Sequence, residues 1–339
     1  MAAAVDALVT GISGFVAGHL ARTLRASGTS VVGVGRRPAS FPIQGVTFEP
    51  VDLRAPVALE DAFARHRPAV VYHLAAVSSL QAAAEEGGVR AMLETNVAGT
   101  WNVLEAARRS GAEAVVVASS DKQYGALAAP PYDDADTTAF LNGGVYELSK
   151  AQQDQAARLW AGAYDLPTVR VARLPNLYGP ADTQWSRIVP GTIRRTVEGE
   201  APRVTAGPAG EALREYVYVA DAVTALIALA ADARARGNAA LRRDDGKLAR
   251  VAYNVGPGTR LPAVGVVEAV QRVLREDFGV EGPAPVVQPG REGVFEPGSQ
   301  FNCTERLATL LPGFAPRPFD AGLRETVPWY LAHLGASAR

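Results

Sequence analysis

The chain has very little lysine, cysteine or net charge. Only three of its 34 basic residues are lysines, Lys122, Lys150 and Lys247, so arginine fills the ordinary surface positions. The one cysteine, Cys303, excludes an internal disulfide framework and a zinc site built from several cysteines. A net charge of −1 provides no basic surface for nucleic acid or an anionic membrane. We therefore expect neither partner.

Long apolar runs are also missing. The longest strongly apolar stretch, Ala222–Ala231, is about half the length needed to span a bilayer. The Met1–Ala4 start lacks the basic segment of a secretion signal and leads directly into a strand-like run. These features predict a cytoplasmic protein, and 339 residues are enough for about two domains.

The first half of the chain alternates β-branched runs with alanine-rich helical patterns. The expected strands are 5–10, 31–35, 46–49, 70–74, 115–119 and 168–173. The expected helices are 17–27, 56–65, 91–110 and 145–164. This alternation is typical of an α/β fold, a Rossmann-type doubly wound parallel sheet, which binds ligands at the carboxyl ends of its strands.

The regular alternation fades after Arg173, where proline and glycine become frequent. We predict a dinucleotide-binding domain over residues 1–174, with returning segments near 215–230 and 251–257. A smaller, loop-rich substrate lobe is expected over residues 175–214 and 259–339. The charged stretch Asp232–Arg250 is interpreted as a solvated insertion.

A glycine-rich turn follows the first expected strand. In Thr10-Gly11-Ile12-Ser13-Gly14-Phe15-Val16, Gly11 permits a tight turn and Gly14 lets the backbone approach a pyrophosphate. The next helix then directs its N-terminus at the negative charge. The pattern predicts a dinucleotide site, and its cofactor-binding candidates are Gly11, Ser13, Gly14, Phe15 and Val16.

The end of the second strand indicates which cofactor binds. An NAD site places a carboxylate there, whereas this strand ends in Gly35-Arg36-Arg37, which suits the 2′-phosphate of NADP. NADP is therefore favoured, and NAD remains the alternative. The other cofactor-binding candidates lie after later strands and on the next helix: Asp52, Leu53, Leu74, Ala75, Ala76, Asn96 and Ser119.

Tyr146 and Lys150 form a Tyr-x-x-x-Lys pair, which chance would produce roughly 0.1 times in this composition. Their spacing places both on one helix face. A nearby ammonium, together with the positive nicotinamide, is expected to lower the pKa of the phenol. The tyrosinate then takes the proton from a sugar hydroxyl as hydride leaves, while Ser120 holds that hydroxyl and Lys150 contacts the cofactor.

These motifs together resemble the extended short-chain dehydrogenase/reductase family, in particular its nucleotide-sugar epimerases and dehydratases. The resemblance covers nearly the whole chain through the motifs at 10–16, 73–76, 119–125, 146–150, 176–180, 214–221 and 253–256. It implies a tightly bound, recycled NADP or NAD and a nucleotide-diphosphate sugar as substrate.

The same resemblance implies roles for the second lobe. Asn176, Arg214 and Arg291 match positions that contact the diphosphate, which favours bidentate guanidinium partners. Arg187 is a weaker substrate-binding candidate. Relatives of this kind usually dimerise through two long helices, here 91–110 and 145–164.

Asp121-Lys122 is the motif that distinguishes between reactions. Many hexose 4,6-dehydratases carry Asp-Glu there and some relatives Asp-Lys, whereas 4-epimerases usually have small or apolar residues. Asp121 would be the acid at the C6 hydroxyl, and Lys122, if neutral, would be the base at C5. The alternative is a structural role, in which the two residues form an ion pair that closes the loop. The stretch 36–41 also resembles the GDP-mannose 4,6-dehydratase subgroup.

We therefore expect an NDP-hexose 4,6-dehydratase. The alternatives are a nucleotide-sugar 4-epimerase, an NADP-dependent ketosugar reductase and a non-catalytic NADP-binding regulator. The sequence does not distinguish the nucleobase or the sugar.

Overall fold

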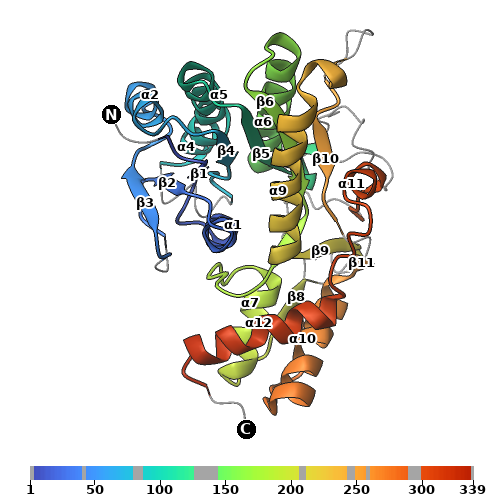
Figure 1. The fold of residues 1–339 in the computed structure, drawn as a ribbon. Helices are drawn as coiled ribbons and strands as arrows, with labels where there is room; N and C mark the ends of the chain where they lie inside the picture. The colour runs from blue at the N-terminus through green and yellow to red at the C-terminus, as the bar shows by residue number, and fades with distance from the viewer. Residues whose placement is uncertain are drawn as a thin grey trace.

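A seven-stranded parallel sheet forms the centre of the larger lobe (Figure 1). The computed structural model describes residues 4–39, 43–78, 87–125, 144–205, 211–242, 249–256, 260–288 and 299–336. The strands of this sheet are β1 (Ala7–Thr10), β2 (Val31–Gly35), β3 (Val46–Pro50), β4 (Val70–His73), β5 (Ala114–Ser120), β6 (Thr168–Leu174) and β10 (Ala252–Asn254). The expected doubly wound fold is confirmed.

Alternate residues of each strand enter two different cores, because side chains along a strand point to opposite faces. Val9 and Val116 belong to the core under α1 (Phe15–Ala26) and α9 (Val219–Arg236). Leu8 and Val115 belong to the other core, under α2 (Pro56–His66), α5 (Gly99–Ser110) and α6 (Val145–Ala163). The strands are therefore buried on both faces, which explains their continuous apolar sequence.

The strand order is β10-β6-β5-β4-β1-β2-β3. The direction of winding reverses between β1 and β4, and in such sheets the crevice beyond the carboxyl ends at this point is the ligand site. The loops after β1, β4 and β5 meet there, so the motifs expected to bind cofactor and to catalyse lie at one sheet edge.

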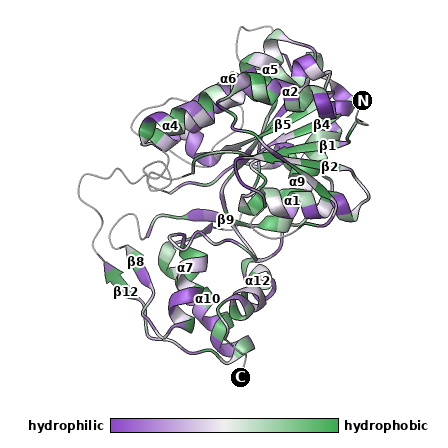
Figure 2. Ribbon diagram, turned by 90° about the vertical axis from the view of Figure 1, so that its left-hand side faces the viewer, coloured by the Kyte–Doolittle hydropathy of each residue, from purple (hydrophilic) through white to green (hydrophobic). Residues whose placement is uncertain are grey.

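The smaller lobe is built from helices and two short sheets (Figure 2). Its helices are α7 (Ile188–Val197), α10 (Ala263–Phe278) and α12 (Phe319–His333), whereas α11 (Glu305–Leu310) packs against β10 and α9 of the larger lobe. One sheet contains β7 (Asn176–Tyr178), β9 (Arg214–Tyr218) and β11 (Arg260–Leu261), and the other contains β8 (Arg203–Thr205) and β12 (Val286–Gln288). The expectation of a loop-rich lobe is wrong for this part, because apolar residues at helical spacing, such as Val266, Val270 and Val273, bury one face of α10.

Two segments, α11 and β9, pack differently from the predicted division into lobes. β9 pairs with β7 and β11 in the smaller sheet, so the chain returns to the larger lobe only at α9. The charged stretch beginning at Asp232 is not all a solvated insertion. Asp232 is buried in the last turns of α9 and pairs with the buried Arg170 at 2.5 Å; residues 243–248 lie outside the described part.

The helix expected over 91–110 is interrupted. A short helix α4 (Val89–Leu93) is followed by a π-helical turn η1 (Glu94–Ala98) before α5 begins. Such π-turns are frequent at functional sites, and this one contains the buried Asn96. Among the described residues, no helix combines the length and hydrophobicity that a membrane crossing requires.

Candidate active site

The glycine-rich turn after β1 has the geometry of a dinucleotide site. Gly11 has a φ of +72°, and a Cβ added there would lie 2.7 Å from the Cα of Ala75. Gly14 is the N-cap of α1 with no side-chain cap, and the first turn contains no acidic residue. The N-terminal end of α1 therefore carries partial positive charge. Gly11 and Gly14 have no side chains that would keep a pyrophosphate away from the backbone there, so the turn fits this group. Ser13, Phe15 and Val16 surround this turn, and Phe15 and Val16 are half-buried.

Arg36 and Arg37 are both exposed beyond the end of β2. A carboxylate near them is Asp52, after β3, which receives two hydrogen bonds from Arg54 at 3.0 and 2.6 Å. These bonds, with the charge of Arg36, keep the pKa of Asp52 below its ordinary value. Leu53 is buried and its carbonyl accepts a hydrogen bond from Asn102. The cofactor contacts of these residues remain predictions.

The loop after β4 is held by buried polar groups. Asn96 accepts a hydrogen bond from the backbone N–H of Val77 at 2.8 Å and donates to Ser149 of α6 at 2.9 Å. It thus fixes the loop that contains Leu74, Ala75 and Ala76 against the catalytic helix. Asn96 therefore positions this region, and its direct contact with a cofactor remains a prediction.

Tyr146 lies in the first turn of α6, and its hydroxyl lies close to the hydroxyl of Ser120 at the end of β5. Ser119, the preceding residue of β5, is buried. The structure therefore brings Tyr146 and Ser120 together. Burial, and then the charge of Asp121, raise the pKa of Tyr146 to about 12.

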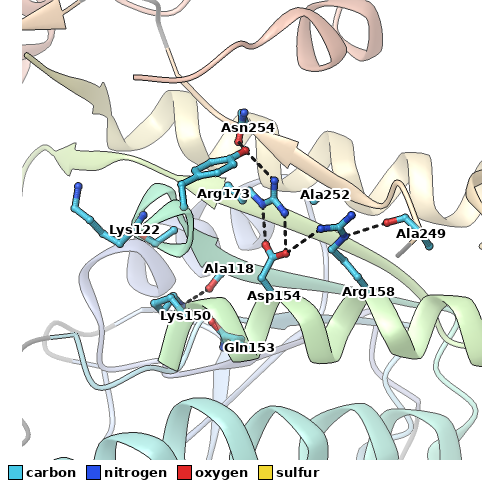
Figure 3. A network of polar contacts seen from close by, with 12 residues as sticks. Ala118, Lys122, Lys150, Gln153, Asp154, Arg158, Arg173, Ala249, Ala252 and Asn254 are labelled. Carbon is cyan, nitrogen blue, oxygen red and sulfur yellow. Dashed lines mark hydrogen bonds and ion pairs between the residues drawn. The ribbon is translucent and has the colours of Figure 1, made fainter. Parts of the chain in front are cut away.

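Lys150 has a different environment from the expected one. Its Nζ donates to the carbonyl of Ala118 at 2.7 Å and to the side chain of Gln153 (Figure 3). Burial lowers the pKa of Lys150 to about 7, with Asp154 opposing the shift. In the chain alone, burial and Asp121 therefore govern the pKa of Tyr146, and the lowering expected from Lys150 together with a bound nicotinamide stays a prediction.

An extended network of buried charges lies behind Lys150 (Figure 3). Arg173 of β6 makes two 2.8 Å hydrogen bonds to Asp154 of α6, and a third to the hydroxyl of Tyr124 at 2.8 Å. Burial opposes ionisation of Asp154, but Arg173 keeps its pKa below the ordinary value. Tyr124 in turn donates to Asn254 of β10 at 2.7 Å. The network fixes α6 and the turn after β5 relative to the sheet.

Asp121 and Lys122 belong to a short 3₁₀ turn, Asp121–Tyr124, directly after β5. Asp121 is buried beside Ser120, which donates to it at 3.2 Å. The Nζ of Lys122 lies 3.4 Å from Asp121 and donates to Oε1 of Gln300 at 2.7 Å. The two residues therefore form an ion pair next to the Tyr146 and Ser120 hydroxyls.

A second buried carboxyl group lies close to Asp121. Glu215 of β9 is fully buried, and its Oε2 accepts hydrogen bonds from the backbone and side chain of Asn302 at 3.2 and 2.9 Å. Burial raises the pKa of Glu215 to about 7, and the charge of Asp121 contributes to the rise. The charge of Asp121 thus opposes the ionisation of Glu215 across the junction of the two lobes.

The residues expected to hold the diphosphate occupy neighbouring positions of the smaller lobe. Asn176 and Arg214 begin the adjacent strands β7 and β9, and Asn176 donates to the carbonyl of Glu215 at 3.2 Å. Arg187 pairs with Asp182 at 3.0 Å, and its charge acts on Tyr146. Arg187 therefore lies near the expected catalytic centre, and Arg291 lies outside the described residues.

Sequence reasoning missed several buried polar residues of this site. His73 at the end of β4 shares hydrogen bonds with Thr10 at 2.8 Å and Thr100 at 2.9 Å, and burial lowers its pKa to about 3. Its place at a strand end next to Leu74 was a usable signal. Glu215 offered only its place next to Arg214 in the sequence, and Gln300 offered no signal, because it meets the catalytic turn only in the folded chain. The described residues contain no cluster of three or more potential metal ligands.

Comparison with known proteins adds the family context. The sequence pattern of the NAD-dependent epimerase/dehydratase family matches residues 7–256. The dTDP-glucose 4,6-dehydratase of Shigella flexneri is 28% identical to this chain, over 96% of this chain and 92% of that protein.

Solved structures with the same fold include epimerases and complexes with a nucleotide sugar. MoeE5 in complex with UDP-glucose and NAD is 28% identical, with a TM-score of 0.78 over 97% of this chain and 99% of that one. The UDP-glucose 4-epimerase of Thermus thermophilus, in complex with NAD, is 28% identical, with a TM-score of 0.77 over 96% and 98%.

The environment of Lys150 makes the stability of the ligand-free chain depend on pH. The pKa of Lys150 is about 7 in the folded chain and about 10.5 in the unfolded chain. Between these pH values the unfolded chain keeps a proton on Lys150 that the folded chain has lost, so the free energy of unfolding rises with pH. Relative to Lys150→Met, the wild type should gain up to about 1.4 kcal/mol of unfolding free energy per pH unit from about pH 7 to about pH 10. Urea titrations of both proteins measure this difference, and parallel pH curves would contradict the neutral state of Lys150.

Proposed function

Because the chain belongs to the NAD-dependent epimerase/dehydratase family, we propose that it is an NDP-hexose 4,6-dehydratase. The observation that carries this proposal is the Asp121–Lys122 ion pair beside the Tyr146 and Ser120 hydroxyls. An epimerase needs only hydride transfer at C4, whereas dehydration also needs an acid and a base at neighbouring sugar atoms. The 28% identity to dTDP-glucose 4,6-dehydratases over 96% of the chain supports the same reaction.

The first step is oxidation of the hexose at C4. When bound, a nicotinamide would supply the hydride acceptor for C4 and the later hydride donor for C6, and its positive charge would favour the tyrosinate. Tyr146 takes the proton of the C4 hydroxyl, and Ser120, beside Tyr146, orients that hydroxyl. Lys150, fixed to Ala118, contacts the cofactor from the same helix face.

The second step removes water across C5 and C6. A proton moved from Lys122 to Asp121 across their 3.4 Å contact leaves a neutral amine and a carboxylic acid. The Lys122 amine then takes the C5 proton, acidified by the C4 ketone, while Asp121 protonates the departing C6 oxygen. The ion pair is restored when water has left. As hydride then adds to C6, the Lys122 ammonium returns its proton to C5, and the proton held by Tyr146 restores the ammonium, so protons balance.

The smaller lobe holds the nucleotide diphosphate through Asn176, Arg214 and Arg291, with Arg187 near the sugar. The proposed cofactor is NAD or NADP, recycled in each turnover. Relatives in complex with NAD support NAD as the cofactor, whereas Arg36 and Arg37 favour NADP.

A nucleotide-sugar 4-epimerase is the second candidate. The UDP-glucose 4-epimerase of Thermus thermophilus shares the fold at the same 28% identity as the dehydratases. In that case the Asp121–Lys122 pair only closes the turn, and the smaller lobe lets the keto-sugar rotate before hydride returns.

A panel of dTDP-glucose, UDP-glucose, CDP-glucose and GDP-mannose distinguishes the two reactions. We expect a 4-keto-6-deoxy product from at least one substrate. Tyr146→Phe should lower turnover by at least about 10²-fold, because the proton acceptor of the first step is gone. Lys122→Ala should still oxidise C4, visible as reduced nicotinamide, but should not release water.

Two results would contradict this proposal. A C4 epimer formed without loss of water identifies an epimerase, and normal dehydration by Lys122→Ala removes Lys122 from the mechanism. Gln271→Ala, on α10 in the smaller lobe, is a matched control that should retain wild-type turnover.

The cofactor choice is tested by the nucleotide that the denatured protein releases. If Arg36 and Arg37 hold a 2′-phosphate, NADP is released, and the double variant Arg36→Ala/Arg37→Ala binds added NADP about tenfold or more weakly without losing affinity for NAD. Release of NAD from the wild type would show that these exposed arginines contact only the adenine side or solvent.

We propose that the protein is a homodimer assembled through α5 and α6. Both helices expose large apolar side chains, Trp101 of α5 at 41% and Leu159 of α6 at 53%. The two helices pack against each other, with the Trp101 ring 5.7 Å from that of the neighbouring Trp160. A matching pair of helices from a second chain would cover these side chains.

Leu159→Asp should convert the dimer to a monomer of 35.6 kDa, because a carboxylate would be buried in the interface. Sedimentation velocity measures the mass. Val286→Asp, a similarly exposed position on β12 of the smaller lobe, should remain dimeric. A monomeric wild type would refute the assembly.

A further inference from the structure

Gln300 lies 178 residues from Lys122 in sequence but contacts it directly. Only 1% of its surface is exposed, and its Oε1 accepts a hydrogen bond from Nζ of Lys122 at 2.7 Å. This contact is shorter than the 3.4 Å contact between Lys122 and Asp121. The lysine side chain is therefore held mainly by an amide of the other lobe.

The orientation of this amide is itself fixed. The Nε2 of Gln300 donates to the carbonyl of Gly125, at the end of the catalytic turn, at 3.3 Å. This bond directs Oε1 toward Lys122, since the two ends of an amide are a donor and an acceptor. Both ends of the side chain thus contact the turn that contains Asp121 and Lys122.

The backbone of Gln300 is anchored to the strand that begins the diphosphate site. Its N–H donates to the carbonyl of Leu213 at 2.9 Å, and Gln300 forms a parallel bridge with Arg214. Two residues later, Asn302 holds Glu215, as described above. Gln300 therefore connects β9 to the turn after β5 through a defined set of hydrogen bonds.

We infer that Gln300 is the positioning residue that holds Lys122 within proton-transfer reach of Asp121, so that it controls elimination of water but not oxidation at C4. The inference rests on the proposed dehydration. The Gln300 amide bonds to Lys122 and Gly125, whereas the Tyr146 hydroxyl lies beside Ser120, so the two steps should separate when Gln300 is changed. Lys122 is also about one-fifth exposed, so without Gln300 its Nζ would move toward solvent.

The test compares Gln300→Ala and Gln300→Glu with the control Gln271→Ala. In single-turnover reactions, Gln300→Ala should reduce the nicotinamide within about twofold of the wild-type rate and release water about tenfold or more slowly, as expected for loss of a hydrogen bond to a charged group. Equal slowing of both steps, or no slowing of either, would overturn the inference.

A second measurement needs no substrate. With three lysines in the chain, the acylation of Lys122 can be followed by peptide mass spectrometry, with Lys150 as internal reference. Gln300→Ala should speed acylation of Lys122 because the amine is released. Gln300→Glu should slow it, because a carboxylate holds the ammonium more strongly. If Gln300 only stabilised the fold, both variants would change the acylation rate of Lys122 in the same direction.

The two measurements separate failure of this inference from failure of the proposed function. If the wild type forms only a C4 epimer, the dehydration itself is wrong, whatever Lys122 acylation shows. If the wild type dehydrates but Lys122 acylation is unchanged in Gln300→Ala, the proposed function stands and the positioning role of Gln300 is wrong.

Discussion

The buried ion pair between Asp154 and Arg173 is the constraint on which the site depends. Asp154 belongs to the helix that contains Tyr146 and Lys150, whereas Arg173 belongs to β6 of the central sheet. A buried pair adds little net stability, because desolvation offsets its attraction, but an unpaired partner would be very unfavourable. The pair therefore specifies one position of α6 along the sheet. Through Tyr124, the same guanidinium also fixes the turn that follows β5 (Figure 3).

The desolvation that makes this pair specific also determines how the site is charged. Lys150 and His73 lie close together at the sheet edge, and both lose affinity for protons because an uncharged surrounding penalises their cationic forms. Tyr146 is shifted in the opposite direction, toward the neutral phenol. In the chain alone, the shifts of Lys150, His73 and Tyr146 are thus all toward their neutral forms. A positively charged ligand beside them would reverse this balance and favour the tyrosinate.

The proposed elimination machinery lies at the junction of the two lobes rather than within either one. Asp121 and Lys122 come from the larger lobe, but two of their polar neighbours, Glu215 and Gln300, come from β9 and the segment beside it. β9 begins at Arg214, the proposed diphosphate ligand. The strand that would bind the nucleotide therefore also shapes the acid and base, whereas the Tyr146 and Ser120 pair depends mainly on the larger lobe.

The sequence by itself determined the sheet, the glycine turn and the Tyr146–Lys150 pair, because each depends on the spacing of residues that are close in the chain. Side chains repeat with a period of two in strands and about 3.6 in helices, and Tyr146 and Lys150 are four residues apart. The sequence did not reveal the helical content of the smaller lobe. The apolar residues of α10 do recur at helical spacing, but this segment lies between others that are rich in proline and glycine. Only the tertiary structure decided that Lys150 is desolvated and that Gln300 holds Lys122. Those properties arise from residues as far as 178 positions apart, and no local pattern encodes which of them meet.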